Sequence, residues 1–211
     1  MKKQNLFFIV LLFVTSMTFS QDISFGVRGG LTVANLSSID LASSMWLPSR
    51  EQKPRTSFNV GIYGQYPLNE KMALQAELFY SGEGVKFKNG GNEAPEQIKL
   101  NYLSLPVFFK YNIVKNFYAM AGPQISYLLA AHSIYENGSV NISSEHNKIA
   151  IGLVPAIGYD WKNFSINLRY QIGLSKLPKS SYGGNLPYSN DNVKSNVFSV
   201  VVSYKIFNAT E

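Results

Sequence analysis

Apolar and polar residues alternate along most of this 211-residue chain, and this alternation constrains the fold more than any other feature. Successive side chains of an extended strand point to opposite faces, so a period of two residues indicates β-strands with one apolar face and one polar face. After residue 20, no long segment shows the period of about 3.6 residues that is typical of a helix. Eight segments show the strand pattern: 23–34, 57–68, 72–85, 98–112, 117–131, 147–160, 164–175 and 198–206.

The connections between these segments alternate between short and long. Outer-membrane barrels place short turns on the periplasmic side and longer loops outside the cell, which is the same alternation. The predicted strands also reach the roughly 9 to 11 residues that a tilted strand needs to span a membrane. The short connections are 69–71, 113–116 and 162–163, and the long polar ones lie near 37–56, 86–97, 132–146 and 176–195.

The direction of the apolar face distinguishes a membrane barrel from a soluble barrel or sandwich, because both show the same alternation. Here the apolar face is almost free of charge, whereas the opposite face combines small residues with a few charges. We therefore predict an all-β fold: an eight-stranded antiparallel up-and-down transmembrane β-barrel with short periplasmic turns and longer extracellular loops. Aromatic residues also gather near the short connections, as at a membrane interface: Tyr66, Tyr111, Phe117, Tyr159, Trp161, Phe164, Tyr204 and Phe207.

The first twenty residues have the pattern of a secretory signal peptide. Lys2 and Lys3 precede an apolar run, and Thr18 and Ser20 supply the small residues of a cleavage site before Gln21. The apolar run is too short to span a bilayer as a helix. We expect residues 1–20 to be removed on export and residues 21–211 to form the barrel domain in the outer membrane.

Composition excludes several other classes of protein. The chain contains no cysteine, so it has no disulfide scaffold, no cysteine-ligated zinc and no lipoprotein anchor. Its formal net charge is +6, but Lys2 and Lys3 of the predicted signal peptide contribute two of these charges. The remaining excess of positive charge is small and its residues are scattered along the chain, so we expect no nucleic-acid partner.

The sequence offers few candidates for chemistry. His132 and His146 lie at the two ends of the third long connection, and we expect both to be solvated because no Asp or Cys accompanies them at metal-ligand spacing. His132 and Ser133 are adjacent on a strand and point to opposite faces, so they do not form a catalytic pair. The glycines of Gly82-Glu83-Gly84 are expected in a loop. We predict no catalytic, cofactor-binding or metal-binding residues and no cofactor.

A charged cluster is expected inside the barrel. Arg28, Glu77 and Arg169 occupy polar-face positions on the first, third and seventh strands, which run in the same direction at similar heights. Gln75 and Gln171 lie one pleat away from them. Because an unpaired charge in a narrow lumen is costly, we predict that Glu77 pairs with Arg28, Arg169 or both and plugs the lumen. The alternative is that lumen water solvates each charge separately.

Four segments resemble the PorT-type outer-membrane β-barrel family of Bacteroidota. The strand Tyr102–Tyr111 (YLSLPVFFKY) resembles the family's YLxIPLLLKY strand, and the segments Phe25–Leu31, Tyr118–Pro123 and Arg169–Leu174 resemble its first, fifth and seventh strands. The resemblance covers essentially the whole chain after the signal peptide. It implies a barrel in the outer membrane, while the activity of most members is undefined and the founding relative is associated with protein secretion and gliding.

The predicted function follows from this fold. An eight-stranded barrel holds side chains or one small ligand rather than an open pore. We therefore expect a non-enzymatic envelope protein whose surface loops carry any binding, with outer-membrane lipid and other envelope or secretion proteins as its partners. One alternative is an accessory subunit of a secretion, gliding or envelope-protein complex. Another is a lipid-modifying barrel enzyme, which would need a His–Ser or His–carboxylate cluster on one face.

Overall fold

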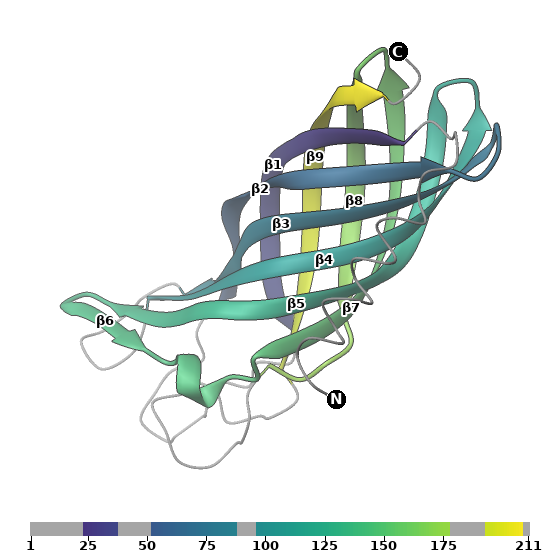
Figure 1. Ribbon diagram of the computed structural model, residues 1–211. Coiled ribbons are helices and arrows are strands. Elements are labelled where there is room, and N and C mark those ends of the chain that lie inside the picture. Colours follow the sequence, from purple (N-terminus) through teal and green to yellow (C-terminus); the bar gives the residue numbers. More distant parts are fainter. Residues whose placement is uncertain (1–22, 38–51, 88–95, 178–192, 209–211) are drawn as a thin grey trace, which may run out of the picture.

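Eight antiparallel strands close into a barrel in the computed structural model, which describes residues 23–37, 52–87, 96–177 and 193–208 (Figure 1). Each wall strand pairs with its neighbours along the chain, and β1 pairs with β9 to close the cylinder. The predicted fold class is confirmed. The wall consists of β1 (Ser24–Ser37), β2 (Gln52–Pro67), β3 (Met72–Phe87), β4 (Gln97–Val114), β5 (Phe117–Tyr135), β7 (Ile149–Trp161), β8 (Phe164–Gly173) and β9 (Lys194–Asn208).

Short turns join the strands at one end of the barrel. Lys162 adopts a left-handed conformation with φ of 54° in the β7–β8 turn, which reverses the chain between Trp161 and Phe164. In the β2–β3 turn the Asn69 side chain accepts hydrogen bonds from the backbone amides of Lys71 and Met72, both at 2.9 Å. Asn is favoured at such positions because its side chain replaces a backbone acceptor.

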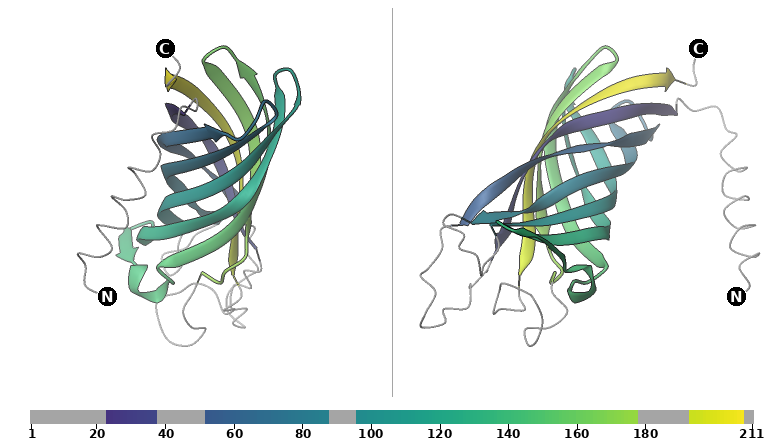
Figure 2. Two further views of the ribbon diagram at one scale, coloured as in Figure 1. Left: turned by 45° about the vertical axis from the view of Figure 1, so that its right-hand side comes forward. Right: turned by 90° about the vertical axis from the view of Figure 1, so that its left-hand side faces the viewer.

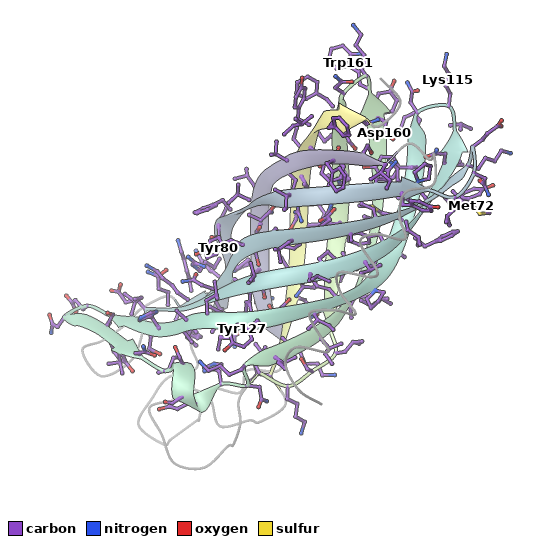
Figure 3. The ribbon with its side chains drawn as sticks, in the orientation of Figure 1. Met72, Tyr80, Lys115, Tyr127, Asp160 and Trp161 are labelled. Atoms are coloured by element: carbon purple, nitrogen blue, oxygen red, sulfur yellow. The ribbon has the colours of Figure 1, made fainter. Side chains whose placement is uncertain are left out.

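The barrel is apolar outside and polar inside, the reverse of a soluble barrel. Leu168 of β8 lies beside its cross-strand partner Val200 on the neighbouring strand β9, and Leu168 is 42% exposed on the outer surface. Arg169, the next residue, is buried inside. Figure 3 shows the side chains that surround the wall, with Trp161, Lys115 and Met72 at the short-turn end. No helix among the described residues is long and apolar enough to cross a membrane.

Aromatic side chains gather at the short-turn end as predicted. The rings of Phe117 and Tyr159 meet edge-on with centroids 4.8 Å apart, and those of Phe164 and Tyr204 lie 4.9 Å apart. These contacts join neighbouring strands at the level where a membrane interface favours aromatic residues.

The connection 132–146 contains more regular structure than the sequence analysis predicted. Strand β5 continues to Tyr135 and turns back into β6 (Gly138–Asn141), which pairs with β5 outside the closed wall (Figures 1 and 2). A short 3-10 helix, η1 (Ser143–Glu145), follows. Gly138 has φ of 152°. The Asn137-Gly138 dipeptide is typical of hairpin turns, so the sequence itself indicates this hairpin rather than the irregular polar loop predicted above.

Candidate functional site in the barrel lumen

The centre of the lumen holds an ion network around Glu77 of β3. Arg169 of β8 donates two hydrogen bonds to its carboxylate, from Nη1 to Oε2 at 2.8 Å and from Nη2 to Oε1 at 3.2 Å. Arg28 of β1 donates to the same carboxylate from Nη1. The three side chains are almost completely buried, with relative exposures of 0 to 5%. Glu77 of β3 therefore links this strand to β1 and to β8, on the opposite side of the wall, through charge-assisted hydrogen bonds.

Polar side chains form further hydrogen bonds with Arg28 and Glu77. Gln75 donates to Glu77 Oε1 at 2.7 Å. Arg28 Nη2 donates to Asn59 Oδ1 at 2.8 Å, and Asn59 in turn donates to Thr32 Oγ1 at 2.9 Å. The network therefore continues across β1, β2 and β3.

Aromatic rings and one further amide surround the two guanidinium groups. Arg169 Nε donates to Asn167 Oδ1 at 2.8 Å. The Arg28 guanidinium lies 3.9 Å from the ring centre of Phe79, and that of Arg169 lies 5.2 Å from the ring centre of Phe108. Such cation–π contacts offset part of the cost of burying charge.

The structure thus places four of the five predicted lumen residues in one cluster: Arg28, Gln75, Glu77 and Arg169. The fifth, Gln171, lies in the next layer and accepts a hydrogen bond from Gln124 at 2.7 Å. Four supporting residues are not part of the predicted cluster, although their inward-facing positions in the alternation indicate them: Asn59, Phe79, Phe108 and Asn167.

A second buried carboxylate, Glu83, lies on the loop side of the Glu77 network. Ser195 Oγ of β9 donates to Glu83 Oε2 at 2.5 Å, and Ser81 donates to Oε1 at 3.4 Å. The expectation that Gly82 and Gly84 lie in a loop is wrong, because both belong to β3 and Glu83 points into the lumen with 1% exposure. Gly84 adopts φ of 134°, a conformation that glycine permits, so the strand continues through this segment.

Large apolar side chains fill the loop end of the lumen. Ile142, just after β6, is fully buried among them, and its backbone amide donates to Ala131 O at 2.9 Å. The alternation predicts mainly small residues inside and does not indicate this cluster. It consists of Leu36, Val85, Phe87, Ile98, Leu100, Tyr102, Leu128, Ala131, Ile142, Leu177 and Val193.

The two histidines occupy different environments. The expectation of a solvated loop residue is wrong for His146, which is fully buried with Nδ1 2.9 Å from Ile142 O. His132 is half-buried on β5 and pairs with Asn141 of β6. Within the described ranges, no group of three or more His, Cys, Asp or Glu residues is arranged to hold a metal ion.

A polar cavity of about 70 Å³ opens at the short-turn end. Lys110 of β4 projects into it and donates to Asp160 Oδ2 of β7 at 2.7 Å. Its ammonium also lies 3.8 Å from the ring centre of Tyr118. Two cavities beside Glu83 and Arg28 hold only about 10 Å³ each, which is room for about one water molecule. Side chains therefore occupy the middle of the lumen.

A closed antiparallel barrel with a lipid-facing apolar surface and a charged, packed interior defines the class of outer-membrane β-barrel proteins. Residues 19–178 match the family described as "Outer membrane protein beta-barrel domain". The chain belongs to this family, and the protein is located in the outer membrane.

Solved structures show the same fold at low sequence identity. The structure of Neisserial surface protein A is similar with a TM-score of 0.57 and 16% identity, covering 86% of this chain and 97% of that protein. OprG from Pseudomonas aeruginosa is similar with a TM-score of 0.55 and 16% identity, covering 88% of this chain and 97% of that protein. A comparison with curated protein sequences finds no match.

Proposed function

We propose that this protein is a non-enzymatic, non-conducting barrel that presents a binding surface at the extracellular end of the outer membrane. The observation that carries the proposal is the filling of the lumen by the Glu77 network and the apolar cluster around Leu100. A wall with this interior anchors and displays the parts of the chain outside the membrane rather than conducting solutes.

The histidines support a non-enzymatic role. His132 is half-buried whereas its neighbour Ser133 is fully buried, in keeping with their opposite orientations on β5. The Nδ1 atom of His146 contacts the backbone carbonyl of Ile142. His132 and Ser133 therefore point to opposite faces, whereas an activated nucleophile needs its base within hydrogen-bond reach.

Conductance measurements test the closed lumen. The purified barrel, inserted in a planar lipid bilayer, is expected to give no discrete channel openings in concentrated salt. The double variant Leu100→Ala, Leu128→Ala removes two large side chains from the apolar cluster and provides a matched control in the same fold. Stable openings in the wild-type protein would contradict the proposal.

We infer that a role as an accessory subunit of a secretion or envelope complex is the second candidate. Two observations favour it: the resemblance of Tyr102–Tyr111 to the PorT-type family of Bacteroidota, and the projection of β6 beyond the wall with all four residues exposed. An exposed strand edge can pair with an extended segment of a partner. Crosslinking from position 139 or 140 in intact cells, followed by purification, is expected to capture a defined envelope protein. The same reagent at Lys115, at the opposite end, serves as the control.

Export through a cleaved signal peptide belongs to this proposal. Residues 1–20 lie outside the described residues, so their role rests on the sequence pattern alone. Intact-mass measurement of the membrane-bound protein should give a chain that begins at Gln21. A chain that retains Lys2 would contradict the proposal.

A further inference from the structure

We propose that the cavity at the short-turn end binds a phosphate group from the periplasmic side. Three lysines and a single aspartate are among the residues that line this cavity. The cavity borders the Glu77 network, since Gln75 and Asn167 of that network also line it, and it lies at the opposite end of the barrel from the long loops. The lysines are Lys110, Lys162 and Lys205 and the aspartate is Asp160.

Lys110 provides a fixed positive charge at the inner wall of the cavity. It is only 5% exposed, and Tyr118 supports its ammonium through a ring contact at 3.8 Å. Asp160 accepts one of its hydrogen bonds at 2.7 Å, while Gln65 Oε1 lies at the longer distance of 3.4 Å. An ammonium group has three donors, so Lys110 retains donor capacity toward a ligand.

Lys205 of β9 supplies a second positive charge from the facing wall. It is half-buried and lines the same cavity as Lys110. In the part of the chain that the structure describes, no carboxylate oxygen lies within 4.0 Å of Lys205 Nζ. Two ammonium groups beside one carboxylate leave an excess positive charge in a recess with low-dielectric walls, and such a recess concentrates anions.

The size and the neutral donors of the cavity favour a phosphate group. A volume of about 70 Å³ holds several water molecules or one small tetrahedral anion. Tyr118 and Ser165 place their hydroxyl groups 2.7 Å apart at the wall, and Ser203 is a further lining residue. Lysine is a common phosphate ligand, and a phosphate has enough oxygens to accept from both lysines and from these hydroxyls.

Free periplasmic phosphate and the phosphate of a lipid headgroup could both supply this group. Phe164, on the apolar outer face, also lines the cavity, so the cavity reaches the level of the aromatic residues that mark the membrane interface. The chemistry of recognition is the same for both sources, and the experiment distinguishes them.

The test measures phosphate binding to the whole barrel in maltoside micelles, which contain no phosphate. Inorganic phosphate is titrated while amide signals are followed by NMR, and the Lys205 amide, which donates to Asn163 O at 2.7 Å, reports on the cavity. A second arm adds short-chain phosphatidylglycerol to the same phosphate-free micelles. Saturable shifts at Lys205 and Asn163 with free phosphate alone identify a free anion as the ligand, and shifts with phosphatidylglycerol alone identify a lipid headgroup.

Three variants make the result specific. Lys205→Gln should weaken binding about tenfold, since it removes a charged donor. Asp160→Asn should strengthen binding several-fold because it removes the competing anion, an effect that misfolding cannot produce. Lys115→Gln, in the β4–β5 turn at the same end, should bind like the wild type. The proposal is overturned if neither probe gives saturable shifts, if Lys205→Gln binds as tightly as the wild type, or if Asp160→Asn binds more weakly.

Discussion

Arg169 and Glu77 form a two-hydrogen-bond pair in the lumen although 92 residues separate them in the sequence. Residue 169 lies on β8 and residue 77 on β3, and no direct pairing joins these strands. The pair, together with Arg28, therefore connects regions of the barrel that the backbone hydrogen bonds do not connect.

Replacing Glu77 by Gln should destabilise the barrel strongly. The change leaves two buried guanidinium groups facing a neutral amide, and loss of one partner from a buried ion pair costs about 3 to 5 kcal/mol. Urea unfolding in lipid vesicles, with folded and unfolded protein separated by electrophoretic mobility, measures the change. Gln75→Ala is the matched reference and should cost less, about 1.5 to 3 kcal/mol, because it removes one hydrogen bond to the carboxylate. Equal effects of the two variants would favour separate solvation of each charge by lumen water.

An arginine on the outer surface should destabilise the barrel according to its depth in the membrane. Leu168 and Val200 face each other on the outer face, so Leu168→Arg or Val200→Arg should cost about 2 to 4 kcal/mol. Ile206→Arg, near the short-turn end, should cost at most about 1 kcal/mol because arginine there reaches the interface. The same unfolding assay compares the three variants. Full tolerance of arginine at 168 and 200 would contradict the lipid-facing assignment.

The strand order and the inward-facing charges could be predicted from the sequence because both depend on the two-residue period. Once strand direction is known, counting in even steps places Arg28, Glu77 and Arg169 on one face and at similar heights. The same count does not show how far each side chain extends into the lumen or which partner it contacts. Gln171 is predicted one pleat away from the charged residues as part of the same network, and in the structure it accepts a hydrogen bond from Gln124.

The loop end of the barrel was harder to predict because the alternation of polar and apolar residues disappears there. Leu100 and Leu128 point inward although their strands also carry apolar residues outward, so the pattern does not distinguish the two faces. The glycines around Glu83 weakened the strand pattern in the same way. Contacts between distant segments, such as Glu83 with Ser195, depend on closure of the barrel and leave no local pattern.

Protease treatment of intact cells should show which end of the barrel faces outward. Trypsin is expected to cut at Arg50 or Lys179, which lie outside the described residues in the long connections, and to spare Lys71, Lys115 and Lys162 in the short turns. Lys53, in contrast, pairs with Lys86 within β2 and β3 and should resist cleavage. Peptide mapping by mass spectrometry gives the cleaved sites. Cleavage confined to the short turns would mean that the orientation is reversed.

The contact between Gly158 and Tyr118 leads to a prediction about packing at the short-turn end. A Cβ atom added at Gly158 of β7 would lie 2.4 Å from both Cζ and the hydroxyl oxygen of Tyr118. Gly158→Ala should therefore displace the ring that supports Lys110 and cost about 1 to 3 kcal/mol, as overpacking typically does. Gly29→Ala is the matched control, since an added Cβ there meets only Asn59 O at 3.7 Å. The control should leave the stability nearly unchanged.

A double-variant cycle separates the steric clash at Gly158 from a general effect of alanine in the strand. Tyr118→Leu removes the two side-chain atoms that the new Cβ would meet at 2.4 Å, although the backbone oxygen of Ile166 at 2.7 Å remains. Gly158→Ala should therefore cost less in the Tyr118→Leu background than in the wild type. The coupling between the two changes should reach about 0.5 to 3 kcal/mol, the range for residues in direct contact. Unfolding free energies of the four proteins give this coupling. Additive effects would show that Tyr118 does not pack over Gly158. They would also contradict the claim that the Tyr118 ring positions Lys110 in the cavity.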